Sequence, residues 1–387
     1  MKTIKDILSD GFWIMPSTPQ FIEGGEIPYI TSKNIKIGNI DFSNVQYISK
    51  EDFEEISKNR PIKVNDMLIS MIGTLGNIAI VKETDGSFYG QNMYLLRLNS
   101  DVIDRDYFYH FFNSDVVKRH IESKKNKSTQ GYLKANHIEE IAIPVPSMEE
   151  QKEIASHFET INSLIDARKS QLDKLDLLVK SRFIELFGEI KETTKLAECC
   201  SRITDYVASG SFASIKENVK FYDVEEYAIM VKTADFANGF TKNLTYTDKH
   251  GYEFLHNSNL FGGELLLSNI GASIGKVHRV PQLNRPMTLA PNAIMIKGNE
   301  LYLDDYLQYF FISHLGQRQL KEMTTATAMP KFNKTQLKEV IVPIAPMELQ
   351  KQFSAFVEQT DKSKLVVQQS LEQLETLKKS LMQQYFG

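Results

Sequence analysis

The chain has very little cysteine, no long apolar run and no excess of positive charge. Its only cysteines are the adjacent Cys199 and Cys200. Neighbouring cysteines are poor partners for each other, and the pair lacks the spacing of a zinc site, so we expect neither disulfides nor metal. The longest apolar runs fall far short of the roughly 18 residues that a membrane span needs. We therefore expect no contact with a membrane.

Two further absences restrict the class of protein. The N-terminal stretch MKTIKDILSDGFW has no apolar signal region, so the expected location is cytoplasmic. The formal net charge is −4, whereas proteins that bind nucleic acid usually carry a basic face. Any DNA-binding surface must therefore be local, or be shared with a more basic partner.

Recognisable catalytic motifs are also missing. Gly271 and Gly275-Lys276 enclose three residues and precede Val277, whereas a phosphate-binding loop needs four residues between its glycines and a Ser or Thr after the lysine. The sequence contains no dinucleotide-binding or methyl-donor glycine motif, no zinc-protease motif and no serine-nucleophile motif. We expect a non-catalytic protein without a cofactor.

The chain does contain a long internal repeat. Ile138 aligns with Leu337 and Gly188 with Gly387, at a constant offset of 199 positions (337 − 138). The sequence IEEIAIPVPSMEEQ thus repeats as LKEVIVPIAPMELQ, and DYFYHFF as DYLQYFF. The chain is therefore a duplication of two units, 1–188 and 189–387. The first unit is 11 residues shorter (199 − 188), mainly in its N-terminal part.

Each unit is predicted to be a mixed α/β (α+β) globular region followed by a long helix. The stretches LISMIG and LLLSNIG indicate short buried strands that end in glycine turns. The aromatic DYFYHFF segment indicates a core helix, with a base-stacking platform as the alternative. We predict globular regions at 1–146 and 189–345, and helices at 147–188 and 346–387.

The two tails follow a heptad pattern. Apolar residues from Ile154 to Leu186 recur at alternating steps of four and three, and those from Phe353 to Tyr385 do the same. A sustained heptad predicts a coiled coil, and about 40 residues give a rod of roughly 60 Å. We expect the two helices to pair antiparallel, with pseudo-two-fold symmetry and the globular regions at opposite ends. The alternative is that each helix packs only on its own domain.

A polar loop before the repeated proline turn is the best candidate for a nucleic-acid contact. Lysines can hold phosphates, and amide side chains can read adenine edges. The corresponding loop of the second unit differs strongly in sequence while its flanks agree, as expected of two readers on one frame. The candidate DNA-binding residues are Lys124, Lys125, Lys127, Ser128, Thr129, Gln130, Tyr132, Lys134, Lys276, Thr324, Thr325, Thr327, Lys331 and Asn333.

Taken together, the chain resembles the specificity subunit of a type I restriction–modification system. The duplicated series carries the resemblance: the glycine segment after a strand, the Asp-Tyr-aromatic helix, and the proline turns that enter long helices. The resemblance implies that each globular region reads half of a bipartite, asymmetric DNA site and that the helices set the spacer. It also implies docking of methyltransferase subunits, two of them, through which restriction subunits join.

Two other functions remain open from the residues alone. A stand-alone DNA methyltransferase could contain the same target-reading design, although neither a methyl-donor loop nor an Asn-Pro-Pro-aromatic motif is present. A scaffold protein that dimerises through its coiled coil is the other alternative, and the divergence of the two polar loops argues against it.

Overall fold

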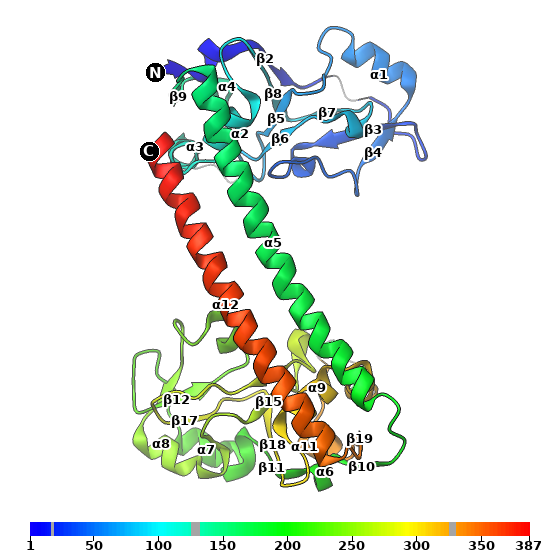
Figure 1. The fold of residues 1–387 in the computed structure, drawn as a ribbon, viewed down its shortest axis with the longest axis vertical. Coiled ribbons are helices and arrows are strands. Elements are labelled where there is room, and N and C mark those ends of the chain that lie inside the picture. The colour runs from blue at the N-terminus through cyan, green and yellow to red at the C-terminus, as the bar shows by residue number, and fades with distance from the viewer. Residues whose placement is uncertain (17–18, 125–131, 325–329) are drawn as a thin grey trace. The chain divides into compact units, whose positions relative to one another are not determined.

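The structure is a computed structural model that describes residues 1–16, 19–124, 132–324 and 330–387 (Figure 1). The chain divides into two units: 1–169 with 369–387, and 170–368. Each unit thus contains one globular region and the adjoining halves of both long helices. Among the described helices, none is both long and apolar enough to cross a membrane.

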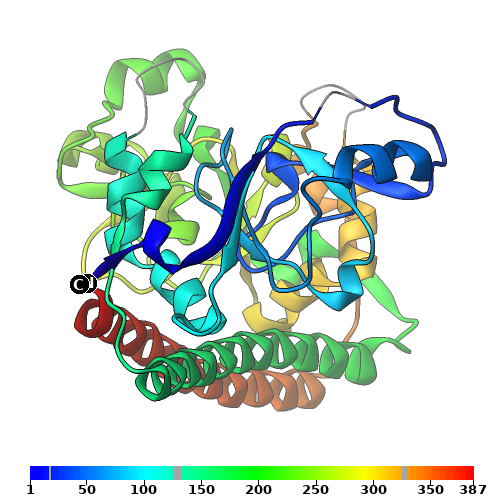
Figure 2. The ribbon, with the colours of Figure 1, turned by 90° about the horizontal axis from the view of Figure 1, so that it is seen from above.

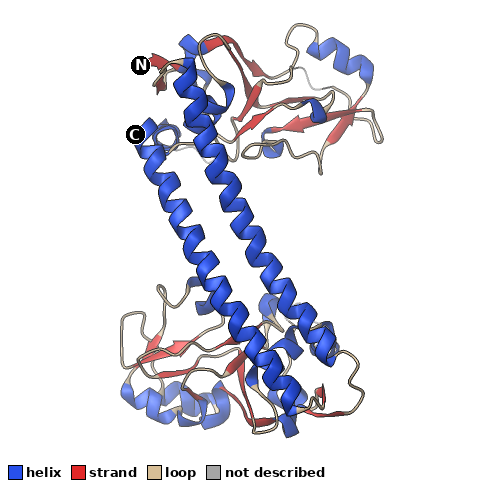
Figure 3. Cartoon of the chain, in the orientation of Figure 1, coloured by secondary structure: helices blue, strands red, loops and turns tan. Residues whose placement is uncertain are grey.

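The first unit is built on two main sheets and a short strand pair (Figure 3). The strands of the larger sheet are all antiparallel, whereas the smaller sheet contains one parallel pair, β3 with β7. The sheet orders are β2 (Leu8–Ile14)–β8 (Met93–Leu98)–β5 (Met67–Ser70)–β6 (Ile78–Ile80), β4 (Gln46–Ile48)–β3 (Ile27–Thr31)–β7 (Tyr89–Gln91), and β1 (Lys2–Thr3)–β9 (Ala142–Ile143). The helices are α1 (Lys50–Ser57), α2 (Arg105–Phe112), α3 (Asp115–Lys124) and α4 (Ala135–Glu139), with 3₁₀ turns Ile4–Ile7, Ser32–Asn34 and Glu83–Asp85.

The second unit repeats this plan. Its sheet orders are β11 (Cys200–Asp205)–β18 (Ala293–Gly298)–β15 (Leu265–Ser268)–β16 (Val277–Arg279), β13 (Tyr246–Thr247)–β12 (Ala228–Val231)–β17 (Met287–Leu289)–β14 (Asn259–Leu260), and β10 (Thr193–Lys195)–β19 (Ile341–Pro343). Its helices are α6 (Leu196–Cys199), α7 (Phe212–Asn218), α8 (Lys249–Phe254), α9 (Asp304–Ile312), α10 (His314–Glu322) and α11 (Lys334–Lys338), with 3₁₀ turns Tyr206–Ser209, Asp235–Asn238, His256–Ser258 and Gly271–Ser273. The mixed α/β class is confirmed, and the extra α7 lies in the N-terminal part, where the second unit is longer.

Glycine turns follow the buried strands β5 and β15, as the sequence predicted. Gly73 and Gly76 have φ of 80° and 78°, and Gly271 and Gly275 have φ of 75° and 79°. Residues other than glycine rarely adopt such φ angles. At Gly76 a Cβ atom would also lie only 2.7 Å from Ile121 Cδ1, so this turn passes directly over α3.

The aromatic helices α2 and α9 belong to the cores, which confirms core packing over a stacking platform. Tyr107 and Tyr306 are at most 1% exposed. The Tyr107 hydroxyl donates to the carbonyl of Pro144 at 2.9 Å, and the Tyr306 hydroxyl to that of Pro343 at 2.8 Å. Each phenol thereby ties its core helix to the proline turn that precedes a long helix.

The long helices are α5 (Met148–Phe187) and α12 (Met347–Phe386). Ser147 and Glu150 form a capping box at the start of α5: the Ser147 N–H donates to the Glu150 carboxylate at 2.9 Å, and the Glu150 N–H to Ser147 Oγ at 3.3 Å. A buried glutamine one residue later fixes the first turn: Gln151 Oε1 accepts from the Asp104 N–H at 2.8 Å, and its amide donates to the carbonyls of Val102 and Pro146. Gln350 repeats this contact with the Leu303 N–H at 2.9 Å.

Antiparallel pairing of α5 and α12 is visible within each unit, where the helices lie side by side (Figures 1 and 2). In the first unit Phe158, near the start of α5, stacks on Phe386 at the end of α12, with ring centroids 5.8 Å apart. In the second unit Phe183 and Phe187, near the end of α5, contact Phe353 at 5.4 and 5.6 Å. Each helix therefore packs on its partner and on a globular core.

The heptad positions are buried or half-buried as predicted, but the stripe shifts at the helix ends. Phe183 and Phe187 are more buried than Arg182 and Leu186, which the 4-3 series favoured. The helix end contacts α9 as well as its partner: Phe187 lies 4.8 Å from Tyr306 between ring centroids. A second packing surface thus rotates the buried stripe by one position.

We expect the substitution Gln151→Met to lower the free energy of unfolding of the first unit by about 2–3 kcal/mol. It leaves the N–H of Asp104 and the carbonyl of Val102 without a hydrogen-bond partner. Urea denaturation with hydrogen exchange of the Asp104 amide measures the effect. The matched control is Gln373→Met, on exposed α12 surface within the first unit, for which a change within about 0.5 kcal/mol is expected. Equal effects of the two substitutions would contradict the role given to Gln151.

Candidate nucleic-acid interface

In each unit the glycine turn and the segment after the candidate loop are brought together, although they are far apart in sequence. In the first unit Ile72 forms a backbone bridge with Tyr132, and the Leu133 N–H donates to the Met71 carbonyl at 3.1 Å. In the second unit Ile270 bridges Lys331 in the same way. The loop flanks of both units therefore have the same frame.

The described candidates of the first unit lie at the two ends of the loop. Lys124 is the last residue of α3 and is exposed, and Lys134 is exposed directly before α4. Tyr132 is 40% exposed at the backbone bridge. The candidates Lys125, Lys127, Ser128, Thr129 and Gln130 lie outside the described residues.

An electrostatic observation shows that Lys124 and Lys134 converge. The pKa of His137 is lowered from its ordinary value of 6.5 by burial first, and then by the charges of Lys124 and Lys134. Glu140 acts in the opposite direction, and His120 adds to the lowering. The two lysines that flank residues 125–131 therefore both act on one imidazole, despite the negative charge of the whole chain.

In the second unit the candidates occupy several environments. Lys276 is exposed at the end of the glycine turn, and Lys331 is exposed at the bridge. Thr324 donates its hydroxyl to the Lys321 carbonyl at 2.7 Å, and Asn333 Oδ1 caps α11 by accepting from the Gln336 N–H at 2.9 Å. The Asn333 carbonyl oxygen is thus engaged in the cap. Thr325 and Thr327 lie outside the described residues.

Lys331 and Asn333 line a surface pocket of about 410 Å³ in the second unit. Its wall also includes Phe212, which is 74% exposed, and Asn292, which has φ of 73°. A cation, amides and an aromatic ring in one pocket can contact a phosphate, a base edge and a base face respectively.

The sequence reasoning missed Tyr206, Phe212, Asn269 and Asn292 as members of this pocket. Asn292 follows Pro291, and a Pro-Asn pair before a strand is a turn signal that could have placed it. Asn92 stands at the same position of the first unit, with φ of 64°. Phe212 lies in the extra segment of the second unit and has no counterpart that could have revealed it.

Comparison with known proteins identifies the family. The family model described as type I restriction modification DNA specificity domain matches residues 1–177 and again residues 199–376. The chain belongs to this family and contains two such domains, in agreement with the resemblance found in its sequence.

Individual relatives support the same assignment. The chain is 23% identical over 378 residues to the putative type I restriction enzyme MjaX specificity subunit of Methanocaldococcus jannaschii, covering 92% of this chain and 85% of the relative. It has the fold of a chain from the solved structure of a type I R-M system, with a TM-score of 0.61, 15% identity and coverage of 99% and 96%. The S subunit of a type I restriction-modification system from M. genitalium gives a TM-score of 0.54, 14% identity and coverage of 100% and 95%.

The titration of His137 provides a test of this interface. We expect saturating duplex DNA to raise the pKa of His137, because phosphates neutralise Lys124 and Lys134 and favour the charged imidazole. The histidine should then take up a proton as DNA binds near its pKa, so binding strengthens as the pH falls through that range. NMR of the imidazole protons measures the shift, and Lys124→Ala should raise the pKa in the free protein. An unchanged pKa with bound DNA would exclude phosphates from this loop.

Proposed function

We propose that residues 1–146 and 189–345 are recognition domains that each read one half of a bipartite, asymmetric DNA site, and that 147–188 and 346–387 set the spacing between the halves. The chain acts as the non-catalytic specificity subunit of a type I restriction–modification complex. Lys124, Tyr132 and Lys134 contact DNA in the first domain; Lys276, Lys331 and Asn333 do so in the second. The complex works in the cytoplasm, where chromosomal DNA is accessible to it.

The observation that carries this proposal is the shared loop frame with different residues on it. The bridges Ile72–Tyr132 and Ile270–Lys331 join equivalent flanks of the two candidate loops to the glycine turns. An aromatic side chain stands where the other domain has a lysine. Two equal scaffolds with unequal contact residues support recognition of two unequal half-sites. A stand-alone methyltransferase is disfavoured, because the relatives described above include a protein named as a specificity subunit.

The outer faces of the helices support docking of methyltransferase subunits. Leu178 and Leu377 are related by the repeat, lie outside the heptad seam, and are 49% and 48% exposed. Further apolar side chains are exposed on the same helices, at Leu164, Leu177, Ile184, Leu365 and Val366. Exposed apolar patches of this kind mark protein interfaces. We propose one methyltransferase subunit at each of the two equivalent leucines, with restriction subunits joining through them.

We expect Leu178→Glu and Leu377→Glu each to remove one of two bound methyltransferase subunits, and the double variant to bind neither. A buried charge without a partner costs several kcal/mol, which suffices to release a subunit. Native mass spectrometry of the co-expressed complex counts the subunits. Gln359→Glu, on exposed helix surface, serves as the control. Two bound subunits in the double variant would contradict docking at these leucines.

Removing one heptad from each helix tests the spacing. Arg168 contacts Ser370 (Nε to Oγ, 3.2 Å) and Lys364 contacts Asp176 (Nζ to Oδ1, 2.6 Å), so residues 169–175 and 365–371 face each other. Deleting both segments preserves the seam and shortens the pair by roughly 10 Å. We expect the gap between half-sites to shorten by about three base pairs, with neither half changed.

Sequencing of methylated sites from the reconstituted complex measures this gap. The control is deletion of 169–175 alone. It makes α5 one heptad shorter than α12, so the apolar positions of the two helices no longer match along their whole length, and methylation should be abolished. A methylated site with an unchanged gap after the double deletion, or a single uninterrupted site in the parent, would refute spacing by the helices.

A further inference from the structure

The first unit also contains a surface pocket of about 490 Å³, and none of the candidate DNA-binding residues lines it. It is formed where the corner between α2 and α3 meets α5 and α12, entirely within this unit. Four lysines and two carboxylates line it, which gives an excess of positive charge: Lys118, Lys169, Lys378 and Lys379 against Asp115 and Glu375.

Lys378 is the most buried of these four lysines, and the other three are exposed. It is half-buried and has neither an ion pair nor a hydrogen bond among the residues that the structure describes. Burial lowers its pKa first, followed by the charges of Lys118 and Lys169, while Asp166 and Glu375 act in the opposite direction. A half-buried ammonium without a direct ion pair is costly, and a bound anion would remove that cost.

Ser114 provides an independent observation at the same pocket. Its side chain is 2% exposed and lines the pocket, and its hydroxyl is buried with no hydrogen-bond partner among the described residues. Buried hydroxyls in native proteins are nearly always paired, so an unpaired one at a pocket wall indicates a missing acceptor. Ser114 also directly precedes the ten-residue helix α3, whose N-terminal end favours negative charge.

The second unit shows what the same place looks like without these features. At the offset of 199 positions, Val179 replaces Lys378 and Gln317 replaces Lys118. The Ser313 hydroxyl, equivalent to that of Ser114, donates to the Phe310 carbonyl at 2.6 Å. Lys364, which aligns with Ile165 of the first unit, is paired with Asp176 at 2.6 Å and with Asp361 at 3.4 Å. The other lysine of this corner is Lys180, which aligns with Lys379 and is exposed.

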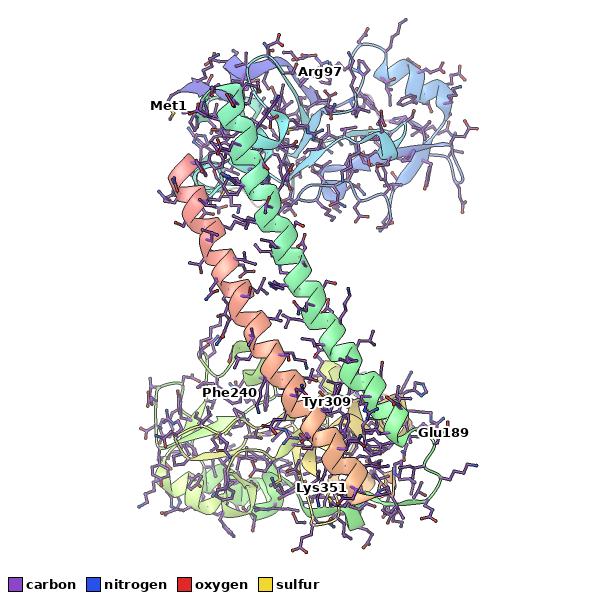
Figure 4. The ribbon with its side chains drawn as sticks, in the orientation of Figure 1. Met1, Arg97, Glu189, Phe240, Tyr309 and Lys351 are labelled. Atoms are coloured by element: carbon purple, nitrogen blue, oxygen red, sulfur yellow. The ribbon has the colours of Figure 1, made fainter. Side chains whose placement is uncertain are left out.

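The aromatic ring of Tyr309, labelled beside α12 in Figure 4, also packs on Phe353 with centroids 5.2 Å apart. The half-buried lysine of the second corner is therefore ion-paired, whereas Lys378, the half-buried lysine of the first corner, is not. The two units share one ancestor, so this difference in charge arose after the duplication.

We propose that the pocket of the first unit binds a phosphate group, with Lys378 as the central cation and the Ser114 hydroxyl as a hydrogen-bond donor. Lys118 and Lys169 complete the positive field. The phosphate belongs either to a free nucleotide or to the backbone of bound DNA. Only the second source rests on the proposed function; the first would make the subunit responsive to a small molecule.

Protection of Lys378 from an amine-acylating reagent tests the proposal in the full chain. Pyrophosphate, ATP and a DNA duplex are the probes, with sodium chloride at equal ionic strength as the blank and mass spectrometry as the readout. We expect at least one probe to slow acylation of Lys378 about ten-fold, as a charge-assisted contact would. Lys180, the exposed counterpart of Lys379 in the second unit, should react at an unchanged rate.

The pattern of protection identifies the source. If pyrophosphate or ATP protects Lys378 when no DNA is present, the pocket is a nucleotide site. If the duplex protects it and neither pyrophosphate nor ATP does, the pocket contacts the DNA backbone. Calorimetry with the protecting probe should show weaker binding by about ten-fold for Lys378→Met and no change for the matched Lys180→Met. Failure of every probe to protect Lys378, or equal affinities of the two variants, would overturn the proposal. Half-site recognition by the assembled complex would be unaffected by that failure.

Discussion

The hydrogen bonds of one buried glutamine at the start of each long helix determine how that helix leaves its globular region. Gln151 and Gln350 are at most 1% exposed, and each uses its carbonyl oxygen and its amide hydrogens on neighbouring backbone groups. A carboxylate could not donate and an aliphatic side chain could do neither, so the contact requires an amide. Because α5 and α12 each contain 40 residues, a change of direction in the first turn is amplified along the helix. The direction of each long helix, and with it the pairing of α5 with α12, therefore depends on this contact.

Patterns that are local or periodic could be predicted from the sequence. The heptads predicted helix pairing, and the glycines predicted the turns after β5 and β15, which the structure shows with positive φ. Contacts that need two packing surfaces at once could not. The burial of Phe183 and Phe187 depends on Tyr306 of α9, and the pocket at Lys331 and Asn333 draws residues from six separate stretches. The unpaired state of Lys378 likewise follows from side chains on three helices, and no single segment reveals it.

The repeat separates what the fold requires from what each unit adds. The tyrosine-to-proline bonds and the glutamine contacts are the same in both units, because their groups are buried and have no water to replace a lost partner. Differences gather where side chains reach the surface: at the candidate loops, in the segment containing α7, and at the corner occupied by Ser114 or Ser313. Duplication thus supplied a frame whose interior cannot change freely and whose surface can.

The negative net charge is compatible with DNA binding because the positive charge is concentrated. The pKa of His137 is lowered by burial first and then by Lys124 and Lys134, and that of Lys378 by burial first and then by Lys118 and Lys169. Fields from such clusters decay over about 8 Å at physiological salt, so distant carboxylates have little effect on a phosphate held against them. Contacts limited to a few lysines also give a weak dependence of affinity on salt. Under the proposed function, most of the nonspecific attraction to DNA comes from other subunits of the complex, and this chain contributes chiefly the choice of sequence.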